Sequence, residues 1–172
     1  MTIPKFPSIA TFVIWSALIF SLCPSLFGQL TIEKKIPKNV PIQIEFVNDD
    51  SPNWFRDLNI KVTNVGNKPI RFLFLDLVLD TLAEDGHRWG FPLTFGNRSL
   101  YSTTELAKST DISLQPSETY TFKIDSPTAD AWELRLSKVG LVERCGAQLR
   151  LGWLNFGDGT GIKGGGTPFK KN

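Results

Sequence analysis

The chain is poor in the residues that build redox, metal and acid–base sites. Its 172 residues include two cysteines, one histidine and one methionine. A closed structural zinc site needs several nitrogen or sulfur ligands, which one histidine and so few cysteines do not supply. The G-x-S-x-G pattern of many hydrolases does not surround His87 either. We therefore expect no catalytic residue, no metal site and no cofactor.

The chain also lacks a large excess of either positive or negative charge. Lys and Arg number 19 against 17 Asp and Glu, a formal net charge of +2. Such a balance gives no electrostatic reason to expect binding to nucleic acid or to an anionic membrane surface. We therefore expect a partner other than nucleic acid or an anionic membrane.

Long apolar runs are absent except at the N-terminus. Residues 9–20, IATFVIWSALIF, follow a short segment with the single charge of Lys5 and precede small and polar residues. This is the layout of a secretory signal peptide, residues 1–28, with cleavage expected after Gly28; an uncleaved anchor is the alternative. The run is short for a bilayer span, so we expect no membrane span after cleavage and a secreted or periplasmic protein.

Cysteine use agrees with a fold held by its core. Cleavage removes Cys23 and leaves Cys145 as the only cysteine in about 144 residues. The bulky Leu22 before Cys23 disfavours a lipoprotein signal there. A lone cysteine forms no internal disulfide. Cys145 is interpreted as a small core hydrophobe, with a disulfide between chains as the alternative.

The most apolar stretch is Leu58–Leu79, which indicates two antiparallel strands. Apolar and polar residues alternate up to Thr63, residues 64–69 (NVGNKP) have turn chemistry, and a second strand starts at Ile70. Along the second strand, the apolar residues change from one face of the strand to the other. Either a bulge near Leu73–Leu75 restores one core face, or the middle of this strand is buried on both faces.

The remaining segments predict further strands, one helix and a tail. Ser126-Pro127 begins a helix that runs towards Val139, although Trp132, Leu134 and Leu136 also fit a strand. Residues 164–172, GGGTPFKKN, are expected to be a disordered tail. Residues 30–163 then form one domain. Strands are expected over 30–36, 40–47, 87–92, 111–114, 118–124 and 141–156.

Three motifs resemble immunoglobulin-like β-sandwich domains of exported bacterial proteins. They are the strand–turn–strand at 58–79, the turn LQPSETYTFKI at 114–124, and LNFGDGTGIKGG at 154–165. Ser117 stands where such turns usually have glycine, and Ile162 where the last motif usually has tryptophan. The resemblance implies an all-β, immunoglobulin-like antiparallel β-sandwich with one short helix before the last long strand. The cysteine pair of antibody domains is absent.

Several polar residues are candidates for a catalytic, metal-binding or glycosylation site. His87 follows Asp85-Gly86 and is expected at a hairpin tip, in water. Asp49, Asp50 and Asp57 flank a loop that suits Ca²⁺, although solvated acidic loops are more common. Asp158 is interpreted as a turn residue. Asn97-Arg98-Ser99 fits the N-glycosylation sequon.

The aromatic residues carry the only candidate ligand contacts. Trp54, Phe55 and Trp89, with Phe91, are expected near strand ends, where exposed rings would stack on sugars or peptides and buried rings would be core. The core interpretation is favoured. We expect a non-enzymatic binding or structural module of the cell envelope, whose partner is another envelope protein or a glycan. The alternative is a carbohydrate-binding accessory domain that uses Trp54, Phe55 and Trp89.

Overall fold

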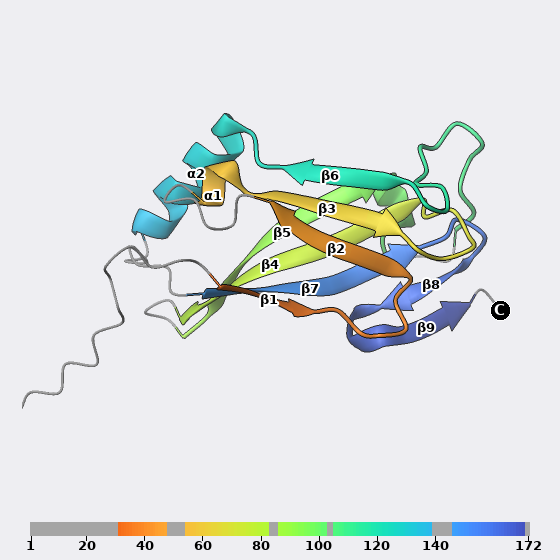
Figure 1. Cartoon of the computed structure of the whole chain (residues 1–172), viewed down its shortest axis with the longest axis horizontal. Helices are drawn as coiled ribbons and strands as arrows, with labels where there is room; N and C mark the ends of the chain where they lie inside the picture. Colours follow the sequence, from red (N-terminus) through yellow and green to blue (C-terminus); the bar gives the residue numbers. More distant parts are fainter. Residues whose placement is uncertain (1–30, 48–53, 83–85, 103–104, 139–145, 171–172) are drawn as a thin grey trace, which may run out of the picture.

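The computed structural model describes residues 31–47, 54–82, 86–102, 105–138 and 146–170, without the side chains of 54, 55, 81, 82 and 136. These residues form two β-sheets that face each other, with the helices at one end (Figure 1). This confirms the expected all-β sandwich with one helix before the last long strand. The expected signal peptide lies outside the described residues.

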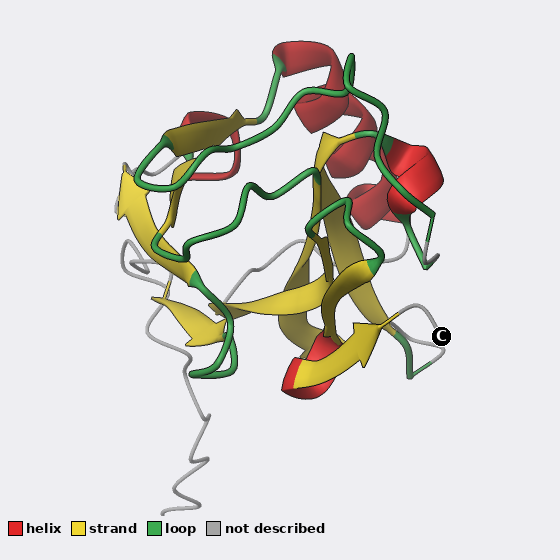
Figure 2. Ribbon diagram, turned by 90° about the vertical axis from the view of Figure 1, so that its right-hand side faces the viewer, coloured by secondary structure: helices red, strands yellow, loops and turns green. Residues whose placement is uncertain are grey.

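One sheet has six strands and the other three. The larger sheet has the order β5-β4-β7-β8-β9, and β1 pairs with β7 in parallel. Its strands are β1 (Thr31–Lys35), β4 (Phe72–Leu82), β5 (Arg88–Gly96), β7 (Gly146–Asn155), β8 (Thr160–Lys163) and β9 (Thr167–Lys170). The smaller, antiparallel sheet contains β2 (Ile42–Val47), β3 (Asn59–Asn64) and β6 (Thr119–Lys123), in the order β2-β3-β6. Figure 2 views the sandwich along the strands, from the end opposite the helices.

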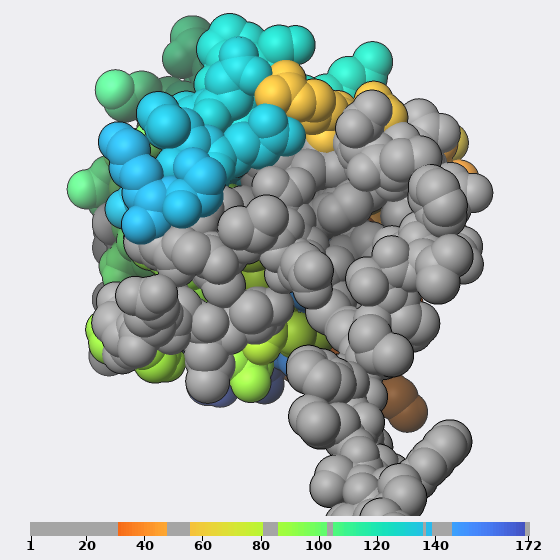
Figure 3. All heavy atoms as spheres, turned by 90° about the vertical axis from the view of Figure 1, so that its left-hand side faces the viewer, coloured from red at the N-terminus to blue at the C-terminus, as the bar shows by residue number. Residues whose placement is uncertain are grey.

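Short helices close one end of the sandwich. Helix α1 (Trp54–Asp57) lies beside α2 (Ser126–Lys138), as Figure 3 shows. The Arg56 guanidinium joins the two helices through ion pairs of 2.6 Å to both Asp130 and Glu133. On the inner side of α2, the Trp132 ring stacks on Phe91 of β5 at a centroid distance of 4.3 Å. The helix therefore covers the open end of the core.

The core lies between the sheets and follows the period of two expected for strands. Its residues include Ile60 and Val62 of β3 and Leu149 of β7, which are all at most 2% exposed. Phe122 of β6 is also buried. Alternation of apolar and polar residues along these strands predicts that all four side chains are buried, and the structure confirms it.

Strand β4 is buried on both faces, and the predicted bulge within it is wrong. Leu73 and Leu75 face the core, whereas Phe72, only 1% exposed, lies outside the core cluster. The pairing of β4 with β5 is regular from Phe72 to Val78. The extra residue lies instead in β7, where the partners of Phe74 and Leu75 are Trp153 and Leu151.

This bulge at Gly152 turns one tryptophan over. Strict alternation along residues 145–153 predicts that Trp153 shares the inner face with Leu149 and Leu151. One unpaired residue reverses the facing of every later side chain, so Trp153 points to the outer face and Leu154 returns to the core.

Two further expectations need correction. Residues 164–170 are not a disordered tail: Gly164–Gly166 form the 3₁₀ turn η2, and β9 pairs with β8. Glycines with φ of 78° and 84° allow this turn, so a composition typical of tails here makes a hairpin. The strand expected over 111–114 is reduced to a single bridge between Leu114 and Ile70.

The turn before β6 gives a stability prediction. Ser117 has a φ of 68°, a left-handed conformation that costs a residue with a Cβ about 1 kcal/mol or more. We expect Ser117→Gly to raise the free energy of unfolding by up to about 1 kcal/mol, because greater freedom in the unfolded chain offsets part of the relief. Urea denaturation measures it. Ser113→Gly, at a residue without a positive φ, should not stabilise, and an equal gain in both variants would contradict the explanation.

Candidate binding groove on the outer face of the six-stranded sheet

Four aromatic rings gather on the outer face of the six-stranded sheet. Phe74 lies on β4, Trp153 on the neighbouring β7, and Phe169 on β9, which β8 separates from β7. Tyr101 follows the 3₁₀ turn η1 (Arg98–Leu100). The Tyr101 ring lies 5.6 Å from Phe74 and 6.0 Å from Trp153, and Trp153 lies 4.6 Å from Phe169, between centroids. We call these four rings the outer aromatic row. Tyr101 is its most exposed member, at 49%.

Glycine makes room for the row. A Cβ on Gly152 would overlap the Phe74 ring, so only glycine lets this ring lie flat on β7. The same glycine is the bulge residue that turns Trp153 outward. One position in the sequence thus sets the orientation of two of the four rings.

Beside the row is a groove of about 320 Å³. Phe72, which is almost fully buried, forms its bottom, and Tyr101 is 6.0 Å from it in an edge-to-face contact. The lining residues are Phe72, Phe74, Pro92, Thr94, Arg98 and Tyr101. The groove is therefore mostly apolar, with the hydroxyls of Thr94 and Tyr101 and the one cation of Arg98.

The side-chain amides of Asn97 and Asn155 fix the loop that carries Arg98 and Tyr101. Asn97 accepts a hydrogen bond of 3.0 Å from the Ser99 N–H and donates one of 3.0 Å to Asp111 Oδ1. Leu100 is 1% exposed, and its carbonyl accepts a 3.0 Å bond from the amide of the buried Asn155. The groove wall is thus held before any ligand arrives. The Asn97 side-chain nitrogen, to which a glycan would be attached in the sequon, already donates a hydrogen bond to Asp111.

Positive charge lies along the row and next to the groove. Arg98 Nη2 is 3.4 Å from Thr94 Oγ1, and in the described part of the chain it forms no ion pair. The Lys163 ammonium sits 5.6 Å from the centroid of Trp153. Further along β4, burial raises the pKa of Asp76, and the charge of its cross-strand neighbour Arg150 opposes that rise.

Of the aromatics predicted as ligand contacts, Trp89 and Phe91 are described, and neither belongs to this surface. Trp89 is partly buried against the core, with Arg135 stacked 4.6 Å from its ring centroid, so the core interpretation fits it. Phe91 is buried beneath Trp132. The side chains of Trp54 and Phe55 lie outside the described residues.

Two further candidates, His87 and Asp57, are described and do not line the groove. His87 is exposed just before β5, and Asp57 is exposed in α1. Cys145, Asp49 and Asp50 lie outside the described residues, and the described ones contain no group of three or more side chains suited to a metal ion.

Asp158 behaves as the turn residue that the sequence predicts. It pairs with Lys68 at 2.7 Å and accepts a bond from the Thr160 N–H. Burial alone would raise the pKa of Asp158, but the hydrogen bonds from Lys68 and Thr160 lower it below its ordinary value.

Sequence reasoning missed the residues that form the row and the groove. Tyr101 and Arg98 lie in a segment expected to be an irregular loop, and Trp153 was assigned to the wrong face. The available signal was Gly152, which interrupts the alternation of the last long strand just before Trp153.

Comparison with known proteins adds no identification. No family model, no curated protein and no solved structure matches the chain. Among the described residues, no helix is long and apolar enough to cross a membrane.

Proposed function

We propose that the protein is an exported, non-enzymatic binding module of the cell envelope, and that the outer aromatic row with its groove contacts the ligand. The observation that supports this most is Tyr101, a half-exposed aromatic held by buried hydrogen bonds at the wall of an apolar groove. A mostly apolar groove with a few polar groups at its wall is the usual form of a ligand-binding site.

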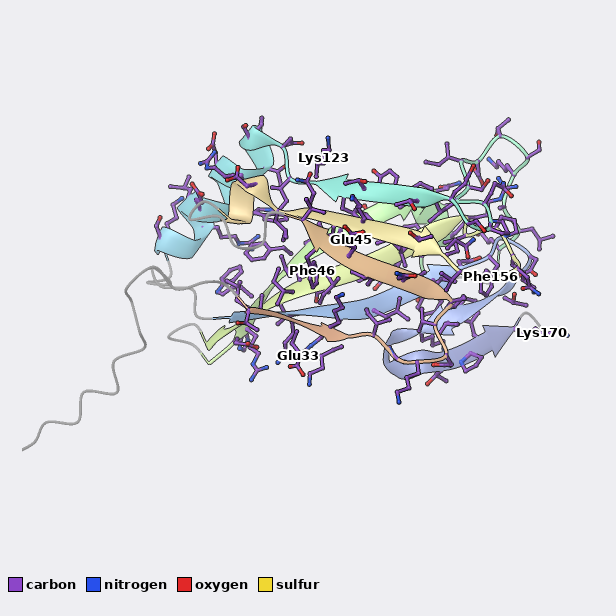
Figure 4. All side chains as sticks on the ribbon, in the orientation of Figure 1. Glu33, Glu45, Phe46, Lys123, Phe156 and Lys170 are labelled. Atoms are coloured by element: carbon purple, nitrogen blue, oxygen red, sulfur yellow. The ribbon has the colours of Figure 1, made fainter. Side chains whose placement is uncertain are left out.

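The edges of the sheets argue against capture of a peptide strand. Pro92 interrupts β5 near its middle, Pro168 lies in the four-residue β9, and Lys34 Nζ donates a 2.7 Å hydrogen bond to the Ile44 carbonyl of β2. Proline and lysine are typical of edges that do not pair with another strand. Lys123 on β6 and Lys170 on β9 lie at the remaining edges (Figure 4). Side chains, rather than backbone, are therefore the better recognition surface.

The lining of the groove supports a non-enzymatic role. Its six residues include no histidine, cysteine or carboxylate, the groups that most often transfer protons in enzymes. Arg98 is permanently charged and serves as a hydrogen-bond donor rather than as an acid or base.

Carbohydrate binding is the second candidate, and the row of rings favours it. Aromatic side chains on the rim of a sheet present flat apolar faces against which sugar rings can stack. The rings that would do so are Tyr101 and Trp153, in place of the Trp54, Phe55 and Trp89 expected from the sequence.

Retention of envelope components by immobilised protein tests the proposal. We expect a component that wild-type protein retains to be lost with Tyr101→Ala. The matched control is Tyr120→Ala, which removes a 37%-exposed tyrosine from the opposite sheet and should retain the component. Elution with oligosaccharides would favour the carbohydrate candidate. Retention that survives both Tyr101→Ala and Trp153→Ala would contradict a role for the outer aromatic row.

A further inference from the structure

We propose that the groove beside Tyr101 binds a small apolar carboxylate, that is, a ring or short hydrocarbon chain ending in one carboxylate group. The hydrocarbon part lies among Phe74, Pro92 and Tyr101, and the carboxylate meets Arg98. This inference rests on the proposed function, because it uses the same surface, and it adds the class of ligand.

The size and lining of the groove fit an apolar group. Its volume of about 320 Å³ lies at the lower end of the range for ligand pockets, about 300–1,000 Å³. Among the described residues that line it, the polar groups are the hydroxyls of Thr94 and Tyr101 and the guanidinium of Arg98. A neutral sugar carries hydroxyls around its ring, and each buried hydroxyl without a partner costs about 1–3 kcal/mol. The groove therefore suits a ligand whose polarity is confined to one end.

Arg98 supplies the complementary charge. Its planar guanidinium offers a fork of donors that matches the two oxygens of a carboxylate. Within the described residues no salt bridge occupies it, and its hydrogen bond to Thr94 is long, at 3.4 Å. Binding a carboxylate thus breaks no strong existing contact.

The loop geometry places this charge before binding. Asn97 caps the turn η1 from which Arg98 projects, and the Tyr101 N–H donates a 3.0 Å hydrogen bond to the Arg98 carbonyl. The nearest acid along β4 on this face, Asp76, is opposite Arg150 in the pairing of β4 with β7. None of the described residues that line the groove is a carboxylate that would compete with the ligand for Arg98.

Calorimetric titration with three small molecules tests the inference. Hydrocinnamate is an apolar carboxylate, hydrocinnamyl alcohol is its uncharged analogue, and glucuronate is a polar carboxylate. We expect hydrocinnamate to bind about ten times or more tightly than the alcohol, since a hydrogen bond to a charged group contributes about 1.5–3 kcal/mol. Glucuronate should bind more weakly than hydrocinnamate.

Two charge-removing variants distinguish a direct contact of Arg98 with the ligand from a general effect of positive charge on affinity. Arg98→Gln should weaken hydrocinnamate binding about tenfold and leave binding of the alcohol unchanged. Lys163→Gln, which removes a cation outside the groove lining, should leave both unchanged. Circular dichroism checks that the variants remain folded.

Several outcomes would overturn the inference. These are equal affinity for hydrocinnamate and the alcohol, no binding of hydrocinnamate, tighter binding of glucuronate, or no effect of Arg98→Gln. Tyr101-dependent retention of an envelope component, together with any of these results, would remove only the ligand class and leave the proposed function standing.

Discussion

Phe72→Ala is expected to lower the free energy of unfolding by about 3–5 kcal/mol, the usual range for a fully buried phenylalanine in a core. Phe72 is 1% exposed and begins β4, whose neighbours on either side are β5 and β7. Tyr101 covers it from the outer side at 6.0 Å between centroids. Removal of the ring leaves a cavity that opens into the groove, because the sheet beneath cannot close over it.

Urea denaturation of wild type and variant measures this loss. Phe169→Ala is the matched control: it removes the same ring from the same face, but from a half-buried position on the edge strand β9. We expect the control to lose clearly less stability. A loss below about 1 kcal/mol for Phe72→Ala would show that the outer face is not packed as described.

Asn64→Ala is expected to cost about 2–3 kcal/mol, because Asn64 is itself fully buried and its loss leaves two part-buried backbone groups of the turn without partners. The side-chain amide of Asn64 donates 2.9 Å bonds to the carbonyls of Lys68 and Leu114, and its oxygen accepts a 3.0 Å bond from the Gly66 N–H. The Leu114 carbonyl keeps a second donor, the Ile70 N–H. The orphaned groups are therefore the Lys68 carbonyl and the Gly66 N–H.

Thermal and urea denaturation of a small set of variants tests this role. Asn59→Ala removes an asparagine from the same strand whose amide makes one exposed bond to the Asp57 carbonyl, and we expect a loss below about 1 kcal/mol. Asn64→Asp keeps the acceptor but loses the amide donor and buries a charge, so it should destabilise at neutral pH at least as much as alanine. If Asn64→Ala and Asn59→Ala behave alike, the amide does not hold the turn.

Local patterns predicted the parts of the fold that depend on neighbours in sequence. Alternation from Leu58 to Thr63 located β3, and Ser126-Pro127 located the start of α2. The turn residues at 64–69 also lie between β3 and β4 as expected. In each case the chemistry of a few consecutive residues is sufficient.

Features that depend on a distant partner were missed. The composition of residues 164–170 suggests a tail, and only the available edge of β8 makes a strand of them. The bulge in β7 is defined by its register against β4, which no local pattern contains. The candidate groove has the same origin, because Phe74, Tyr101 and Trp153 come together only when these strands pair. Trp54 and Phe55 are adjacent in the chain, whereas Phe74 and Trp153 are partners across two paired strands.

The parallel pairing of β1 with β7 sets an order of events for a newly made chain. Thr31 lies beside Gly146, so nearly the whole described chain separates the two partners. A chain that emerges with its N-terminus first exposes β1 long before β7 exists, and contacts of such sequence separation slow folding. During that interval Lys34 and Lys35 keep the unpaired strand from associating with other chains. The six-stranded sheet is complete only after β7, in the C-terminal third of the protein, has emerged. We therefore expect β1, the first described strand, to be among the last to pair.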